Sequence, residues 1–141
     1  PVPLLAVALL VVNDHWLKAA WPGWWTGNLS DVAGMLFFPL LLQACVEWAL
    51  ARWGRPWGPD RRVLVGAAIA TMLVFSAVQL WPLATEAYRW GLGLLQLPFR
   101  ALGDARSIRP VEVSPDPSDL LALPFVGVAI LAGWRRASRG A

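Results

Sequence analysis

The chain has 141 residues, of which 57% are hydrophobic and only 15% are charged, and its mean hydropathy is +0.53. A soluble domain normally carries about a quarter charged residues, so this composition indicates a membrane protein. One cysteine and one histidine exclude a disulfide framework and a Cys/His zinc site, and no haem motif is present. The net charge of +3 comes with basic residues that flank apolar runs, so nucleic acid is not an expected partner.

The first apolar segment predicts a transmembrane helix over residues 2–21. It is apolar up to Asn13 and then reaches Asp14, His15 and Lys18. Its start resembles a signal-peptide core, but it leads into a tryptophan-flanked turn, so we expect a retained helix. Because the sequence does not begin with Met, we expect a processed chain or one that lacks its first residues.

Two similar signals open the second and fourth helices, predicted over residues 30–52 and 118–135. A Ser-Asp pair precedes an uncharged run at Ser30-Asp31 and again at Ser118-Asp119. Such a pair is typical of a helix N-cap with an acid in the first turn. Within the second helix Glu47 is expected to extend toward Arg52 and the interface, with little functional meaning. Because both halves of the chain share this layout, a parallel duplication is suggested.

The third helix is predicted over residues 62–82, because a stretch without charge runs from Val63 to Thr85. Its 23 residues exceed the roughly 20 that a spanning helix needs. Polar side chains inside the membrane favour hydrogen bonds between helices over a transport path. These are Gln43, Thr71, Ser76 and Gln79. Small residues of this helix suggest an exposed docking face, namely Gly66, Ala67, Ala68 and Ala70.

Between the third and fourth helices, residues 84–103 are too interrupted to span with confidence. Leucine and phenylalanine recur there at helical spacing, which favours an interfacial or re-entrant helix on the outer surface. The proline-limited segment from Arg109 to Pro117 is expected to be extended. The fold class is therefore all-α: a polytopic membrane protein with one four-helix transmembrane domain over residues 1–141 and this additional segment.

Arginines set the expected orientation. They crowd the loop between the second and third helices and follow the fourth, whereas residues 19–30 carry no charge. Short arginine-rich loops stay cytoplasmic, so we expect a bacterial inner-membrane protein with cytoplasmic termini. The ten tryptophans fall at helix ends, as in an interfacial aromatic belt.

This topology brings polar residues of all four helices to the outer side. The expected ligand- or cation-binding set is Asp14, His15, Lys18, Asp31, Glu86 and Asp119. Close carboxylates repel, so they need a proton, a hard cation held by oxygen, or a basic partner. The basic candidates are Lys18, Arg89, Arg106 and Arg109. In the alternative interpretation the acids are ordinary caps, Asp14–Lys18 and Glu86–Arg89 are surface ion pairs, and His15 is structural.

The positions Asp31, Glu86, Asp119 and Gly127 give the chain a resemblance to the VanZ-like group of small bacterial membrane proteins. The resemblance covers residues 30–133. Val32 stands where the family tends to have Lys, and Leu123 where an Asn would be expected. The resemblance implies four helices and a role in glycopeptide resistance or cell-surface biology, without a defined chemistry.

Three function classes follow. The first is a membrane protein whose outward-facing acidic site binds a cation or a small polar or envelope-lipid ligand. The second is an accessory or structural subunit of a larger membrane complex, which suits a small chain with short loops. The third is a membrane-embedded enzyme with a carboxylate or His15 as base, although no nucleophile, metal-ligand or phosphate-loop motif supports it. Membrane lipids are expected partners in each class.

Overall fold

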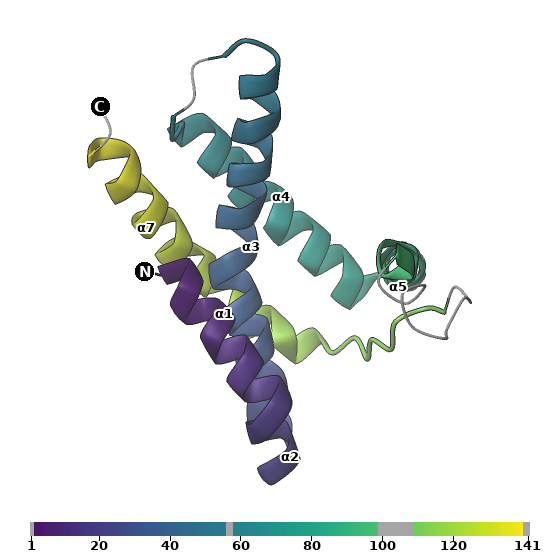
Figure 1. The fold of residues 1–141 in the computed structure, drawn as a ribbon. Helices are drawn as coiled ribbons and strands as arrows, with labels where there is room; N and C mark the ends of the chain where they lie inside the picture. Colours follow the sequence, from purple (N-terminus) through teal and green to yellow (C-terminus); the bar gives the residue numbers. More distant parts are fainter. Residues whose placement is uncertain (1, 56–57, 99–108, 140–141) are drawn as a thin grey trace. The chain divides into compact units, whose positions relative to one another are not determined.

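A computed structural model describes residues 2–55, 58–98 and 109–139 (Figure 1). This part of the chain is helical and contains no strand, which confirms the all-α prediction. Four helical segments are long and apolar enough to cross a membrane, as the sequence predicted. They are Pro3–Ala20, Trp25–Arg52, Arg61–Leu80 and Pro117–Ser138.

The first of these segments changes its winding partway along. Helix α1 (Val2–Val12) passes into the π-helical turn η1 (Asn13–Leu17), and α2 (Lys18–Ala20) completes the segment. In the π turn the Lys18 N–H bonds to the Asn13 carbonyl, one residue farther than in an α-helix. The chain then turns through Trp21, Pro22 and Gly23.

Helix α3 (Trp24–Arg52) begins six residues before the predicted start at residue 30. Thr26 closes its first turn, because its hydroxyl donates to the Gly23 carbonyl (2.9 Å) and accepts the Gly23 N–H (3.3 Å). Ser30 and Asp31 therefore lie inside the helix, and the prediction that Ser30 is its N-cap is wrong. The preceding Pro22-Gly23 turn ends the first segment, so the next helix can start at once.

Helix α4 (Arg61–Leu80) has a conventional N-cap. The Asp60 carboxylate accepts the Arg62 N–H at 2.7 Å, and the Asp60 carbonyl accepts the Leu64 N–H. The Glu47 carboxylate of α3 accepts the N–H of Asp60 itself at 2.9 Å. The loop between α3 and α4 is thus tied to both helices by carboxylates.

The fourth segment starts as the 3₁₀ helix η2 (Pro117–Phe125) and continues as α7 (Val126–Arg139). The Asp116 carboxylate accepts the Ser118 N–H at 2.8 Å, and Pro117 occupies the first helical position. Asp116 therefore caps η2, and the prediction of a Ser118 cap is also wrong. Pro124 lies in η2 and has no N–H to donate, so the chain adopts its regular α-helix only after Phe125.

Helix α5 (Pro82–Leu95) covers much of the predicted segment 84–103; residues 99–103 lie outside the described part. An extended stretch runs along it. The Arg89 backbone accepts the Val111 N–H (3.1 Å), and the Arg89 guanidinium donates to the Val111 carbonyl (3.0 Å). The backbone of Arg109 comes so close to Gly93 that no side chain fits there.

The chain divides into two compact units. One comprises residues 1–73 and 121–141, and the other residues 74–120. In the first, α1 and α7 both pack on α3. Its buried residues are mostly small: Ala6, Ala33, Met35, Leu64, Ala67, Ala68, Val126 and Ala129. Ala67 and Ala68 are thus used in internal packing, so the prediction that they belong to an exposed docking face is wrong.

Candidate functional site

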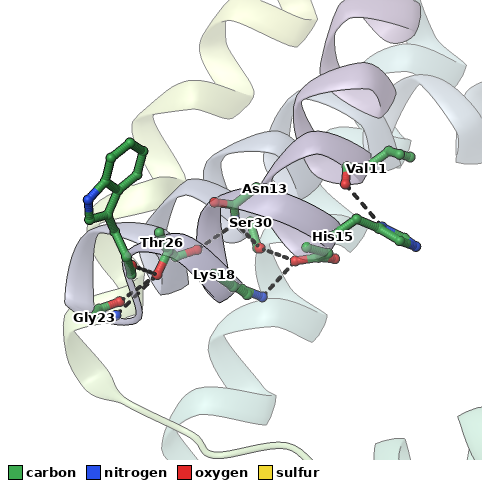
Figure 2. A network of polar contacts seen from close by, with 9 residues as sticks. Val11, Asn13, His15, Lys18, Gly23, Thr26 and Ser30 are labelled. Carbon is green, nitrogen blue, oxygen red and sulfur yellow. Dashed lines mark hydrogen bonds and ion pairs between the residues drawn. The ribbon is translucent and has the colours of Figure 1, made fainter.

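The most unusual polar residue of the first unit is Asn13, which opens the π turn and is 0% exposed. Its Nδ2 donates to the Thr26 carbonyl at 2.6 Å and to the Ser30 hydroxyl at 2.8 Å (Figure 2). Both acceptors belong to the first two turns of α3. Asn13 therefore joins the two antiparallel segments at the end where the connecting turn lies.

The chain of hydrogen bonds continues outward from Ser30. Because the Ser30 oxygen accepts from Asn13, its proton is available to donate, and it donates to Asp14 Oδ1 at 2.9 Å. Lys18 pairs with the same oxygen at 2.7 Å, and the two charged side chains are about 40% exposed (42% for Lys18 and 41% for Asp14). We call Asn13, Asp14, Lys18 and Ser30 the outer network.

One atom of this network has no partner. Asn13 Oδ1 is buried and accepts no hydrogen bond within the described residues. The opposite amide orientation would place Oδ1 against the Thr26 carbonyl oxygen, so the orientation is fixed by that contact. A buried polar atom left unsatisfied costs about 1–3 kcal/mol, which makes this oxygen the natural contact point for a group that donates a hydrogen bond.

His15 lies in the same π turn but points away from the outer network (Figure 2). Its Nδ1 lies 3.1 Å from the Val11 carbonyl oxygen. Since a carbonyl can only accept, Nδ1 carries the proton and Nε2 is left as an acceptor on an exposed ring. His15 is therefore not part of the same constellation as Asp14 and Lys18.

The remaining predicted site residues have different surroundings. Asp31 is half-buried on α3, next to Ser30. In the second unit, Glu86 pairs with Arg89 at 2.6 Å, and Asp119 accepts from Gln79 Nε2 at 2.8 Å. Asp14–Lys18 and Glu86–Arg89 thus form the ion pairs that the alternative interpretation of the sequence expected.

The predicted convergence of the acids spans the two units. Asp14 and Asp31 belong to the first unit, and Glu86 and Asp119 to the second. Their common site stays a prediction. Among residues 2–55, 58–98 and 109–139 no group of three His, Cys, Asp or Glu side chains is arranged to hold a metal ion. The proposed basic partner Arg106 lies outside these residues.

Gln79 makes the contact between segments that the sequence predicted. Besides donating to Asp119, its Oε1 accepts the Asp116 N–H at 3.1 Å, so it holds the start of η2 from α4. Gln43 and Thr71 instead bond within their own helices, to Glu47 Oε1 and the Ala67 carbonyl, which contradicts the prediction for them.

The contacts of three residues, Asn13, Ser30 and Glu47, were missed from sequence. Asn13 and Ser30 were noted as polar residues at helix ends, but their mutual contact depends on the antiparallel pairing of α1 and α3. Glu47 was expected to extend toward Arg52; instead it accepts from Gln43 (2.7 Å) and from Asp60. Arg52 stacks over the Trp48 ring at 4.6 Å. A carboxylate just inside the end of a span was the only available signal.

No protein-family model, curated protein or solved structure matches this chain. The resemblance to VanZ-like membrane proteins stays a prediction from the residues named above.

Proposed function

We propose that the chain is a multi-pass integral membrane protein that binds a small polar ligand at the outer network. The unsatisfied, buried Oδ1 of Asn13 is the observation that carries this proposal. Asp14 and Lys18 add ionisable groups to the same network, and ionisable groups in a proposed span are functional candidates by default. The four apolar segments support insertion, and the exposed tryptophans near their ends support an interfacial belt.

The network defines the chemistry of the ligand. Asn13 Oδ1 can only accept, so the ligand supplies an O–H or N–H group. Asp14 and Lys18 offer an acceptor and a donor at the exposed edge of the network. This pattern suits a small polyhydroxyl or amine-bearing molecule, or a lipid headgroup of that kind.

A hard cation suits the network less well. Calcium takes six to eight oxygen ligands. In the network the Asp14 Oδ1 atom, which accepts from Ser30, already pairs with Lys18, so its negative charge is neutralised. We therefore propose the polar-ligand form of the function. By the arginine distribution, the network faces the outer side of a bacterial inner membrane and the termini are cytoplasmic.

The test uses the full chain extracted in mild detergent from its own membranes and examined by native mass spectrometry. We expect a small adduct on the wild type that is lost in Asn13→Leu and weakened in Ser30→Ala. Gln96→Met removes an amide without a side-chain hydrogen bond among the described residues, and it should keep the adduct. Circular dichroism checks that each variant stays helical.

Three results would contradict the proposal. An adduct-free wild type, or an adduct retained in Asn13→Leu, would remove the ligand site. Release of the chain from membranes by alkaline carbonate would remove the integral membrane assignment. A fixed protein partner in place of a small adduct would favour the accessory-subunit alternative.

A further inference from the structure

A small hollow lies at the opposite end of α3, where the chain passes into α4. Its volume is about 40 Å³, and it is lined by Glu47, Leu50, Arg55, Gly58, Asp60 and Val63. All six residues belong to the first unit. A site for one water needs roughly 10–15 Å³, so the hollow has room for about three water-sized groups, enough for the ammonium end of a lipid headgroup.

The hollow carries two half-buried carboxylates. Glu47 Oε1 accepts from Gln43 and from the Asp60 N–H, and Asp60 Oδ1 accepts from the Arg62 N–H. The ion pairs among the described residues are Lys18–Asp14 and Arg89–Glu86, so no cationic side chain of this part neutralises either carboxylate. Two acids that share a hollow favour a bound cation.

The third charged group of the hollow has the opposite sign. Arg55 is exposed and makes no ion pair with the described residues. The lining thus offers half-buried negative charge beside exposed positive charge. A zwitterion with an ammonium group and a phosphate matches this order, with the ammonium inside and the phosphate at Arg55.

The position of the hollow favours a lipid over a soluble zwitterion. It lies where the apolar spans Trp25–Arg52 and Arg61–Leu80 end. Trp48 and Trp53 are next to it in sequence and are 53% and 83% exposed, as at a headgroup layer. This step rests on the membrane insertion of the proposed function, but not on the outer network.

We propose that this hollow binds the headgroup of a phosphoethanolamine lipid. The ammonium group donates hydrogen bonds to the carboxylates of Glu47 and Asp60, and the phosphate lies against Arg55. A choline headgroup cannot make these hydrogen bonds, because its three methyl groups replace every N–H donor.

The experiment offers delipidated full chain in detergent an equal mixture of phosphatidylethanolamine and phosphatidylcholine with the same acyl chains. Native mass spectrometry then counts the bound lipid. We expect about a tenfold preference for the ethanolamine lipid, the size of one charge-assisted hydrogen bond. Glu47→Gln and Asp60→Asn keep an oxygen that can accept the backbone N–H groups of the loop and of α4, but they remove the negative charge. Each substitution should reduce the preference for the ethanolamine lipid toward unity.

Matched controls separate the two charges. Arg55→Gln should weaken both lipids equally and leave the ratio unchanged, whereas Arg135→Gln and Glu112→Gln should change nothing. Four results would overturn the inference: no preference in the wild type, a preference that survives in both carboxylate variants, stronger binding of phosphatidylglycerol, or equal stabilisation by free O-phosphoethanolamine. Each applies while carbonate extraction still shows an integral protein, so the two proposals fail separately.

Discussion

The two Ser-Asp pairs look alike in sequence and do different work in the structure. Ser30-Asp31 lies inside α3, where the Ser30 hydroxyl links Asn13 to Asp14 across two helical segments. Ser118-Asp119 lies in the first turn of η2, where Asp116 binds the Ser118 N–H and Gln79 binds the Asp119 carboxylate. Ser30 thus joins two helical segments from inside a helix, whereas Ser118 lies at the start of a helix that Asp119 joins to α4.

This difference shows that the residues before a Ser-Asp pair decide whether the pair lies inside a helix or at its start. Pro22-Gly23 ends one segment, and Thr26 closes the next turn, so α3 starts before Ser30 is reached. Asp116-Pro117 supplies a cap and a proline at the first helical position, so η2 starts just before Ser118. Four substitutions test this comparison.

The largest loss of stability is expected at Gly93 of α5, where the extended stretch that leads to Ser118-Asp119 passes close to the helix. In Gly93→Ala the new Cβ would collide with the Arg109 carbonyl oxygen. Because backbone must move, the free energy of unfolding should fall by about 3 kcal/mol. Thermal unfolding of the full chain in detergent measures it. Gly91→Ala, which meets nothing within 4 Å on the same helix, should be neutral or stabilising by up to about 1 kcal/mol. Equal effects of the two would contradict the close approach.

The two serines should respond unequally. Ser30→Ala removes a part-buried hydroxyl that accepts from Asn13 and donates to Asp14, and should cost about 1.5 kcal/mol. Ser118→Ala loses the side-chain hydrogen bond of Ser118 to the Asp116 carboxylate but keeps the backbone N–H that this carboxylate binds, so it should cost only about 0.5 kcal/mol. Denaturant titration in the same detergent compares them. A larger loss at Ser118 would reverse the comparison.

Gln79→Met removes both hydrogen bonds that hold the second pair from α4, to Asp119 and from Asp116. We expect a loss of about 1 kcal/mol, since hydrogen bonds inside membrane proteins average less than that each. Hydrogen exchange at the Asp116 amide should also accelerate. Gln96→Met serves as the control and should leave both readings unchanged.

The smallest effect concerns pH. The pKa of the Asp116 carboxyl lies below its ordinary value of 3.8, chiefly because the Ser118 backbone N–H donates to its ionised form. A lowered pKa means that the cap is fully present above pH 3.8 and is lost as pH falls through the folded-state value. NMR titration of the Asp116 carboxyl carbon should give a midpoint below 3.8. A midpoint at or above it would contradict the cap.

The membrane-spanning helices of this fold could be predicted from the positions of apolar and charged residues along the sequence. The charge-free run after Val63 and the arginines that flank the spans predict helices of membrane-spanning length. Contacts between residues far apart in the sequence were harder to predict. The contact of Asn13 with Ser30 depends on a π turn and on antiparallel packing, and neither leaves a periodic signal. Glu47 looked like an interfacial side chain because its acceptor role depends on the fold of the following loop.

The most direct test is an experimental structure of the full chain in lipid nanodiscs, at a resolution that shows ordered water, read around Asn13 Oδ1. We expect non-protein density larger than one water within hydrogen-bond distance of this oxygen, in contact with Asp14 or Lys18. A single water there, or a donor from another part of the chain, would show that the outer network is purely structural and would contradict the proposed ligand site.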